Sequence, residues 1–404
     1  MPQQRLTFAQ EDVSLEVPDG SAWVRRSLPA SVVNVRAATH AALREPLDFP
    51  PLGRCFTPDD RVTVIIREEI NGLVPVLIAV LEELQTASVS LEAITLLCPP
   101  RLFCLEPVWH AELPPAFQQI PVVVHDPADQ LQLAYLANTD AGRRVYLNKL
   151  VVDADQLIIL GRARYDPSLE YSGGLSDLFP ALSDEATRTE FLLKPTEALQ
   201  GKRAWPVRQE VDEVGWLLGM PFLVQVLEGT GDDVVAVVAG SAAAVGLAMR
   251  AKLKGQDRVA VRRTADLVIA TLNGDPRRQI FAEVSQAFAN ANRIVAPGGR
   301  IVVLSRSQGE LGPGSTYYRQ AENPIQALAL VRKHKTPDMV SWWHVTLAAS
   351  RASLYLLGGW PSEVVEELFM VPLDHPGQVQ KLIDEAELVT IFPDANRVQA
   401  VVEK

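Results

Sequence analysis

Short apolar runs alternate along the chain with segments in which apolar residues recur at helical spacing. The run at residues 61–66 (RVTVII) is apolar and β-branched, which predicts a buried strand. Residues 74–84 carry the helical spacing, and a second helix is expected over residues 127–136. Strands that alternate with helices predict an α/β protein, with a mostly parallel sheet and helices on its faces. Further strands are predicted at residues 5–8, 13–17, 93–97, 121–124 and 156–160.

The alternation continues through the second half of the chain and divides it into two units. A chain of 404 residues exceeds the usual size of a single core, so two domains are expected. The segment at residues 254–263 is polar and basic and precedes a new apolar strand at residues 267–271. We therefore predict an N-terminal domain of residues 1–262 and a C-terminal domain of residues 263–404. In this prediction, the tail of roughly the last 30 residues either stays with the second domain or packs back on the first domain.

Two serines are predicted to cap helices. Ser183 precedes a helical pattern at residues 184–193, and Ser241 precedes one that runs through Lys252. A serine side chain in this place accepts the free N–H groups of the first helical turn. Other elements are expected as helices at residues 209–218 and 277–292 and as strands at residues 234–238 and 300–304.

Composition and charge limit the classes of function. Apolar residues at 48% and charged residues at 22% are typical of a soluble globular protein. The net charge of −11 argues against a nucleic-acid partner, because phosphate contacts need a basic surface. No secretory signal is expected at the start, and the apolar window at residues 234–249 is too short and broken to span a membrane. Three cysteines in so long a chain favour a reducing compartment, which predicts a cytoplasmic protein.

The stretch at residues 161–187 is where a binding site is expected. It follows a predicted strand and begins with two arginines, Arg162 and Arg164, before the tight loop at residues 171–174 (YSGG). Paired glycines allow a backbone to turn sharply and to approach a ligand closely. A loop at the carboxyl end of a buried strand is the usual place for a site in an open α/β sheet. An ordinary glycine-rich turn between a strand and a helix is the alternative.

Other catalytic motifs do not occur in the sequence. The six histidines are scattered without a spacing that suits zinc, so no metal site is predicted. There is no Gly-x-Ser-x-Gly elbow and no phosphate-binding Gly-x-x-x-x-Gly-Lys-Ser/Thr loop. Gly240 and Ser241 precede a helix without the three-glycine spacing of a dinucleotide site, so a nicotinamide cofactor is not expected.

Taken together, three blocks of the sequence resemble the nickel-pincer-dependent lactate racemase family. Residues 47–75 are similar to the family's lead-in to its first strand and Asp-x-Thr-Arg loop. The central stretch is similar to the family's strand and Gly-Tyr/Phe-Ser-Gly-Gly-x-Lys loop. Residues 265–314 look like the opening of the family's second domain, with its catalytic helix and glycine-bearing strand. The resemblance implies a two-domain lactate-racemase-like fold, with mostly parallel sheets flanked by helices and a cleft between the domains.

At the positions that the resemblance marks for the cofactor and for proton transfer, this sequence carries other residues. The lysine that holds the nickel-pincer nucleotide in the family corresponds to Ser176, so no cofactor is expected here. The histidine expected close to the cofactor corresponds to Asp166, and the one that ligates nickel falls near Leu192. The acid/base histidine of the family's Gly-Thr-His-Arg segment corresponds to Pro100, beside Arg101.

The substrate-binding positions differ as well. The family's Asp-x-Thr-Arg loop, whose arginine holds the substrate carboxylate, corresponds to the segment from Glu68 to Asn71. The glutamine and lysine of the second-domain helix correspond to Glu283 and Gln286. Racemisation of a 2-hydroxy acid needs a hydride acceptor, a base on the hydroxyl and a cation for the carboxylate. All three are absent from the expected positions, so we expect that the nickel-pincer mechanism has been lost.

The leading hypothesis is a divergent member of the family without the cofactor, either a pseudoenzyme or a binding protein for a small, hydroxy-acid-like organic anion. A small carboxylate is then the expected partner, whereas nucleic acid and membrane are not. The ligand-binding candidates are Glu68, Asn71, Arg101, Arg164, Tyr171, Ser172, Gly173, Gly174, Ser176 and Gln286. Further charged candidates are Arg67, Glu69, Arg162, Arg277 and Arg278.

Two alternatives belong to other classes. An active racemase or epimerase on a 2-hydroxy acid would use Asp166 and Glu283 as an acid/base pair that faces across the cleft, within hydrogen-bond reach of the substrate. A structural role in a complex would require a large exposed apolar patch and no convergent polar pocket. The YSGG loop also has a purely structural explanation, under which valine at Gly173 or Gly174 damages folding or the cleft.

Overall fold

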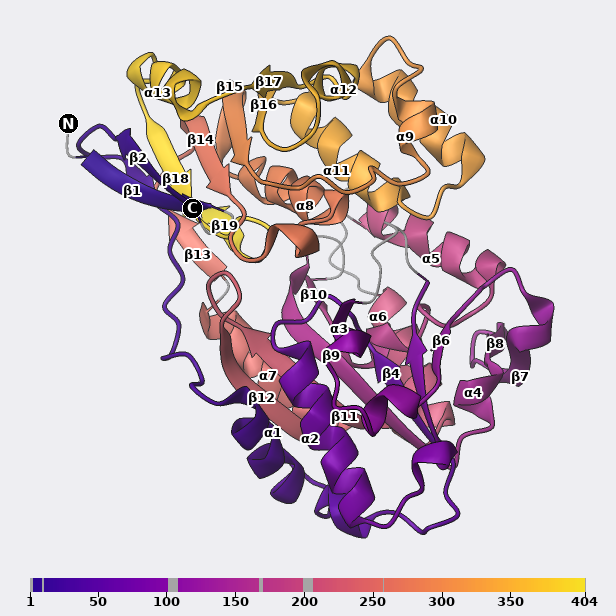
Figure 1. The fold of residues 1–404 in the computed structure, drawn as a ribbon. Helices are drawn as coiled ribbons and strands as arrows, with labels where there is room; N and C mark the ends of the chain where they lie inside the picture. The colour runs from indigo at the N-terminus through magenta and orange to yellow at the C-terminus, as the bar shows by residue number, and fades with distance from the viewer. Residues whose placement is uncertain are drawn as a thin grey trace.

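The chain folds into two domains, each built around one main β-sheet that is mostly parallel and carries helices (Figure 1). The first domain holds a seven-stranded sheet and the second a six-stranded sheet. This is the α/β architecture that the alternating strand and helix patterns predicted. The computed structural model describes residues 3–8, 11–100, 108–166, 170–198, 206–256 and 258–403.

The strand β9 lies inside the first sheet and positions most of the site. It pairs in parallel with β4 on one side and β11 on the other, while β10 pairs with it in antiparallel orientation. Every residue of β4 and of β11 is buried, as expected for strands covered on both faces. In sheet order the strands are β12 (Val234–Ser241), β11 (Phe222–Glu228), β9 (Gln156–Asp166), β4 (Val62–Ile66), β5 (Ile94–Cys98) and β6 (Val122–Val124), with β10 (Glu170–Ser172) on β9.

Helices cover both faces of the first sheet. Ile158 of β9 packs into a core with side chains of α1 and α2, whereas its neighbour Ile159 packs into a second core with α6 and α7. The alternation follows from the strand geometry, in which successive side chains point to opposite faces. The helices are α1 (Val35–Arg44), α2 (Leu73–Thr86), α3 (Val108–Ala111), α4 (Lys149–Val152), α5 (Glu185–Ala198), α6 (Pro206–Leu217) and α7 (Ala242–Gln256).

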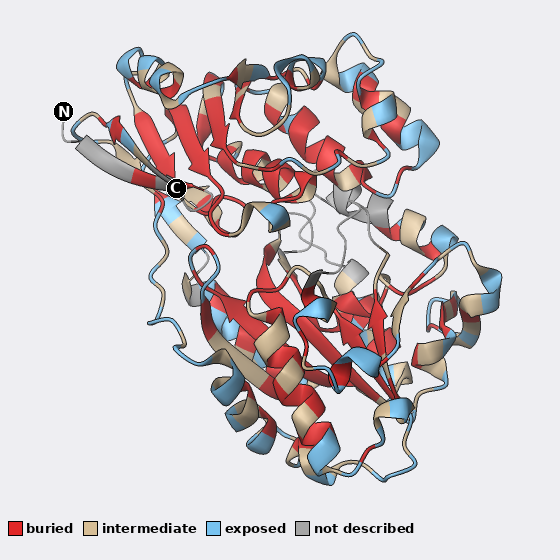
Figure 2. Cartoon of the chain, viewed as in Figure 1, coloured by how far each residue is buried: buried red, intermediate tan, exposed pale blue. Residues whose placement is uncertain are grey.

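The second sheet is parallel throughout and is also covered on both faces. Figure 2 shows the buried residues concentrated on the strands of the two main sheets. In sheet order its strands are β17 (Val371–Leu373), β16 (Ser353–Leu357), β15 (Val295–Leu304), β14 (Ala265–Thr271), β18 (Val389–Phe392) and β3 (Ala22–Trp23). Its helices are α8 (Phe281–Ala291), α9 (Ser315–Tyr318), α10 (Pro324–His334), α11 (Met339–Ala349), α12 (Ser362–Glu367) and α13 (Pro376–Asp384).

The N-terminal strands belong to the second domain, which differs from the predicted division at residue 262. The short strand β3 pairs with β18 in the second sheet. The antiparallel hairpin of β1 (Gln3–Phe8) and β2 (Glu11–Glu16) contributes Leu6 and Leu15 to a core shared with Val302 of β15. The hairpin buries these apolar side chains against that sheet, and such long-range packing leaves no mark in the local pattern.

The tail stays mainly with the second domain. The strand β18 is an inner strand of its sheet, and β19 (Gln399–Val402) pairs in parallel with β13 (Arg258–Val261) at the junction between the domains. Arg397 reaches back to the first domain through hydrogen bonds to the carbonyl groups of Gly229 and Gly231. The tail therefore contacts the first domain without joining its sheet.

Most predicted elements are present, and two predictions are wrong. The helix expected at residues 127–136 is replaced by β7 (Leu133–Asn138), which pairs with β8 (Arg144–Asn148) in an antiparallel hairpin. Asp184 caps α5 instead of Ser183, because its carboxylate accepts a hydrogen bond from the Thr187 N–H while the Ser183 hydroxyl donates to the Pro180 carbonyl. Ser241 caps α7 as predicted, accepting from the Ala244 N–H at 3.3 Å.

None of the helices in the described ranges combines the length and the apolar character that a membrane crossing requires.

Candidate functional site

Strand β9 presents two chemically different faces at its carboxyl end. Arg162 and Arg164 point toward the second domain, where both make ion pairs. Ala163, between them, lines a cavity on the opposite face of the sheet. Because successive side chains of a strand point to opposite faces, one short segment of β9 borders an ionic cluster on one face and a cavity on the other.

The ionic cluster joins β9 to α8 of the second domain. The Glu283 carboxylate accepts hydrogen bonds from Arg164 Nη1 and Nη2, both at 2.8 Å, and from Arg162 Nη2 at 3.0 Å. Asn396 of the tail donates to the same carboxylate, and Arg164 also donates to Gln286 Oε1 at 2.8 Å. Burial alone would raise the pKa of Glu283, but the two guanidinium charges outweigh it and hold the pKa well below its ordinary value. Glu283 is therefore a buried, ionised group.

Glu228, at the end of β11, extends the cluster. Its carboxylate lies 3.6 Å from Arg162 Nη1 and 3.9 Å from Arg397 Nε. Burial opposes ionisation here too, yet the charges of Arg162 and Arg397 lower the pKa of Glu228 to about 2. Each buried carboxylate thus faces buried arginines, and the arginines come from both domains.

Asn71, a predicted ligand-binding residue, connects the two domains instead of facing a cavity. Its side-chain amide donates to the carbonyl groups of Gly231 and Asp233, both at 2.9 Å. Its backbone N–H donates to Glu228 Oε1, and its side-chain oxygen Oδ1 accepts from Arg278 of the second domain at 3.2 Å. Asn71 is buried, so these partners define its surroundings.

The predicted acid/base pair lies at the same end of β9. Asp166 is the last residue of the strand, two positions beyond Arg164. Its charge favours protonation of His344 on α11, but burial dominates and lowers the pKa of His344 to about 4. Glu283 does face β9 across the domain boundary, where its carboxylate is held by Arg162 and Arg164. A proton-transfer role for Glu283 would require these ion pairs to break.

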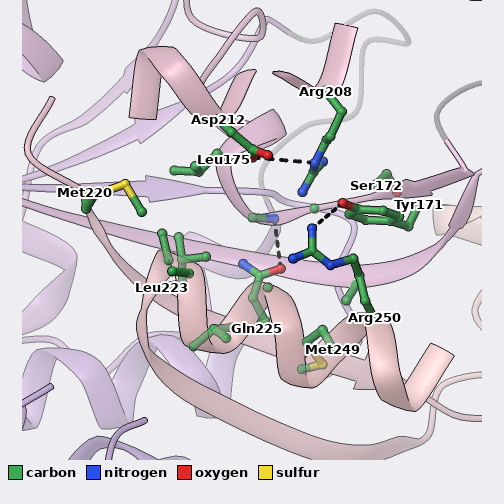
Figure 3. A pocket seen from close by; sticks show the side chains of 17 residues that line it. Tyr171, Ser172, Leu175, Arg208, Asp212, Met220, Leu223, Gln225, Met249 and Arg250 are labelled. Carbon is green, nitrogen blue, oxygen red and sulfur yellow. Dashed lines mark hydrogen bonds and ion pairs between the residues drawn. The ribbon is translucent and has the colours of Figure 1, made fainter. Parts of the chain in front are cut away.

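A cavity of about 250 Å³ opens on the opposite face of β9, between the YSGG loop, α6 and α7 (Figure 3). It collects Tyr171, Ser172, Gly173 and Gly174, which the sequence predicted as ligand-binding residues. The remaining lining residues are Ala163, Leu175, Arg208, Asp212, Met220, Leu223, Gln225, Ala242, Ala243, Val245, Gly246, Met249 and Arg250.

Two arginines from different helices meet at the ring of Tyr171 in this cavity. The guanidinium carbon of Arg208 lies 4.2 Å from the ring centroid and that of Arg250 lies 5.5 Å from it. Arg250 donates to the Tyr171 hydroxyl at 2.6 Å, and Arg208 Nε lies 3.8 Å from Asp212 one helical turn away. Within the described part of the chain, Arg208 Nε and Nη1 are buried without a hydrogen-bond acceptor.

The YSGG loop is held in its turn by local hydrogen bonds. Gly173 has a φ of +103°, and a side chain built there would come within 1.8 Å of the Arg162 carbonyl oxygen. Ser176 accepts a hydrogen bond from the Gly173 N–H at 2.9 Å and donates to the Gly173 carbonyl at 3.0 Å. The Gly174 N–H donates to Gln225 Oε1 at 3.0 Å. The Ser176 hydroxyl thus closes its own loop, and Ser176 is not among the residues that line the cavity.

The other predicted residues are dispersed around the cluster or on the surface. Glu68 accepts a hydrogen bond from Trp109 Nε1 at 2.8 Å, and Arg277 pairs with Asp275 on the surface. Arg67 pairs with the fully buried Asp177 at 2.7 Å, and burial raises the pKa of Asp177 despite that charge. Arg101 lies outside the described residues.

Sequence reasoning missed Arg208 and Arg250 because charged residues on helices usually face solvent. The spacing of Arg208 and Asp212 by four residues was the available signal for the first. Glu228 was not predicted from the sequence either. A carboxylate at the end of the mostly apolar run FLVQVLE signals a buried charge that needs partners. The partners, Arg162 and Arg397, lie far apart in the sequence and could not be paired from it.

The sequence and the fold have counterparts among known proteins. Residues 8–191 match the family model of the lactate racemase N-terminal domain. The lactate racemase of Thermoanaerobacterium thermosaccharolyticum is 20% identical over 293 residues, which is 67% of each chain. The apoprotein structure of lactate racemase from that organism superposes with a TM-score of 0.78 at 17% identity over 100% of both chains. A crystal structure of a Thermotoga maritima protein gives a TM-score of 0.69 at 11% identity, covering 93% of this chain and 100% of that one.

These findings define a two-domain α/β protein with the lactate racemase fold. The likeness to lactate racemases that the sequence blocks indicated is thus found in the family model of their N-terminal domain over residues 8–191, in the sequence of one relative and in the fold.

The residues present do not fit the nickel-pincer nucleotide that the family resemblance implies. Ser176 stands where the resemblance expects the lysine, and its hydroxyl is engaged within its own loop. Pro100 offers no proton-carrying group in place of the expected histidine. In the described ranges, His, Cys, Asp and Glu side chains nowhere gather in a group of three or more that suits a metal ion. The side chain of Leu192 lies outside the described part.

Proposed function

We propose that this lactate-racemase-like protein works without the nickel-pincer cofactor and binds a small organic anion in the cavity behind β9. The observation that carries the proposal is Arg208, a residue that lines the cavity and whose Nε and Nη1 are buried without a hydrogen-bond acceptor among the described residues. A buried donor left without an acceptor costs free energy, so a ligand that supplies an acceptor is favoured. Arg250 adds a second cation, and Asp212 offsets only one of the two charges.

The closed contact between the domains supports the same choice of site. Glu283 fills the space in front of Arg162 and Arg164 with a carboxylate that belongs to the chain itself. A ligand in that place would have to displace three charge-assisted hydrogen bonds. The cavity behind β9 needs no such displacement. The alternative of a racemase with Asp166 and Glu283 as its acid/base pair has no comparable support, because Glu283 is already paired.

The test combines mass spectrometry with calorimetric titration. Protein expressed in a host that makes the pincer nucleotide is expected to have the mass of the bare chain, and a covalent adduct would contradict the loss of the cofactor. Acetate, lactate, butyrate and hexanoate are then titrated into the wild-type protein. At least one is expected to bind with one-to-one stoichiometry.

A matched pair of variants locates the binding. Arg208→Gln is expected to lower the affinity for the carboxylate at least tenfold, because a hydrogen bond to a charged group contributes about 1.5–3 kcal/mol. Arg319→Gln removes a surface arginine that pairs with Glu367 in the second domain and is expected to leave the affinity unchanged. Equal affinities in the wild type and Arg208→Gln would refute this site.

A further inference from the structure

The cavity behind β9 has two chemically distinct ends. Figure 3 shows Arg208, Tyr171 and Arg250 together at one end, and Met220, Leu223 and Leu175 at the other. The polar end presents two guanidinium groups and a phenol, whereas the other end is lined by apolar side chains that come from separate segments of the first domain. A ligand that fits both ends must itself be polar at one end and apolar at the other.

The charge at the polar end matches one carboxylate. Two arginines stand there against the single carboxylate of Asp212, which leaves about one positive charge for a ligand. Arg208 Nε and Nη1 are two buried donors without a hydrogen-bond acceptor among the described residues, and a carboxylate accepts guanidinium donors in pairs. A dicarboxylate would have to place its second charge among Met220 and Leu223, where no described side chain offers a cation.

The volume of the cavity limits the size of the apolar part. An apolar cavity of about 150 Å³ accepts benzene, so the 250 Å³ here correspond to a ligand of on the order of ten non-hydrogen atoms. Lactate is smaller and carries a hydroxyl in place of an apolar chain. Methionine side chains such as Met220 and Met249 adapt to tails of different shape.

We infer that the cavity binds an amphiphilic monocarboxylate, with its carboxylate at Arg208 and Arg250 and a short hydrocarbon tail among Leu175, Met220 and Leu223. This inference rests on the proposed function and names the ligand class of that site. The inference predicts a preference for carboxylates with a hydrocarbon tail over compact hydroxy acids, because the apolar end contributes to affinity only when a tail reaches it.

Gly246 of α7 offers a way to fill the cavity without disturbing the fold. Ala243, Gly246 and Arg250 follow one another at spacings of three and four residues and all line the cavity, so they share one face of the helix. A side chain at Gly246 would meet no atom within 4 Å. Gly246→Leu therefore extends into the cavity, while Gly246→Ala adds only one methyl group and serves as its control.

The experiment titrates acetate, butyrate, hexanoate and lactate, together with the neutral alcohol 1-hexanol, into the full-length protein by calorimetry. Each methylene buried at the apolar end is expected to tighten binding about fourfold, which corresponds to the usual 0.8 kcal/mol per buried CH₂ group. Hexanoate should therefore bind at least tenfold more tightly than butyrate and lactate. Hexanol lacks the carboxylate and should bind at least tenfold more weakly than hexanoate.

The variants assign the effect to this cavity. Gly246→Leu should lower the affinity for hexanoate at least tenfold and the affinity for acetate by less than threefold. Gly246→Ala should keep both affinities near those of the wild type. Both variants should unfold at or above the wild-type temperature, because glycine is about 1 kcal/mol less favourable than alanine inside a helix. Unchanged binding of hexanoate to Gly246→Leu would overturn the inference.

The remaining outcomes separate the inference from the function on which it rests. If lactate binds as tightly as hexanoate and depends on Arg208, the ligand class is wrong and anion binding in the cavity stands. If no carboxylate binds at millimolar concentration, both the ligand class and the proposed function are wrong.

Discussion

Gly173 is the residue at which a single side chain would do most damage. Its φ of +103° is strained for every other residue type, and a Cβ atom would sit 1.8 Å from the Arg162 carbonyl oxygen. Gly173→Val must therefore move the loop away from β9. We expect the free energy of unfolding to fall by about 3 kcal/mol or more, measured by urea denaturation.

Gly174 provides the matched comparison in the same loop. Its φ is +65°, but a Cβ atom there would lie 3.4 Å from Leu223 Cδ1, an ordinary contact. Gly174→Val should cost only the conformational strain of about 1–2 kcal/mol and should also narrow the cavity. Equal losses for the two valine variants would contradict a close approach that is specific to Gly173.

At the scale of elements, the two faces of strand β9 have different surroundings. The face with Arg162 and Arg164 joins the domains, and the face with Ala163 borders the cavity. The arginines are 3% and 5% exposed at their side chains, so their charges depend on their partners and not on water. The contact between β9 and α8 is therefore stable only while Glu283 remains ionised.

Glu283→Gln tests that dependence. The amide keeps the size of the carboxylate but removes the charge that faces Arg162 and Arg164. Leaving a buried charge without its counterion costs about 3–5 kcal/mol, so we expect a loss of that order in the free energy of unfolding. Amide hydrogen exchange in α8 and at the end of β9 should also accelerate, because the domains separate more easily.

The control removes a carboxylate of the same type from a surface pair. Glu385, which is 67% exposed, pairs with Arg300, and exposed pairs contribute about 1 kcal/mol or less. Glu385→Gln should change the free energy of unfolding by no more than that. If Glu283→Gln proves equally mild, the buried cluster does not hold the domains together.

How far the sequence predicts the molecule also depends on the scale of the element. The strand β4 and the helix α2 were predictable because their apolar periodicity is local. The hairpin of β7 and β8 and the place of β3 beside β18 were not, since both depend on partners distant in sequence. In the site, the YSGG loop was predictable from its glycines, whereas Arg208 and Arg250 become neighbours only when α6 and α7 pack on the same sheet.

At the scale of the whole molecule, charged residues from both ends of the chain fasten one domain to the other. Arg26 donates to the carbonyl groups of Glu228 and Gly229, and Arg397 donates to those of Gly229 and Gly231. Arg278 of the second domain pairs with Asp232 in the turn after β11 and donates to the Ile70 carbonyl. The turn after β11 is thus held by three arginines of the second domain, which favours one fixed arrangement of the two domains over a freely opening cleft.

The burial of titratable side chains makes the stability of the protein depend on pH. His344 on α11 is 2% exposed, and burial lowers its pKa to about 4 from the ordinary value of 6.5. Below pH 6.5 the unfolded chain binds a proton that the folded chain excludes, so stability falls as the pH drops from 6.5 toward 4. Glu228, with its pKa lowered to about 2, continues the loss at lower pH, because the unfolded carboxylate takes up its proton first.

His344→Gln isolates the histidine part of this dependence. Glutamine does not titrate, so the free energy of unfolding of the variant should fall less steeply between pH 6 and 5 than that of the wild type. The difference between the two slopes should reach up to about 1.4 kcal/mol per pH unit. The measurement is the free energy of unfolding by urea at pH 8, 6 and 5 for both proteins. At pH 8 the histidine is neutral in the folded and the unfolded chain, so the difference there reports only the change in packing. Identical slopes between pH 6 and 5 would mean that His344 takes up its proton in the folded protein, which requires water or the Asp166 carboxylate to reach it at the junction between the domains.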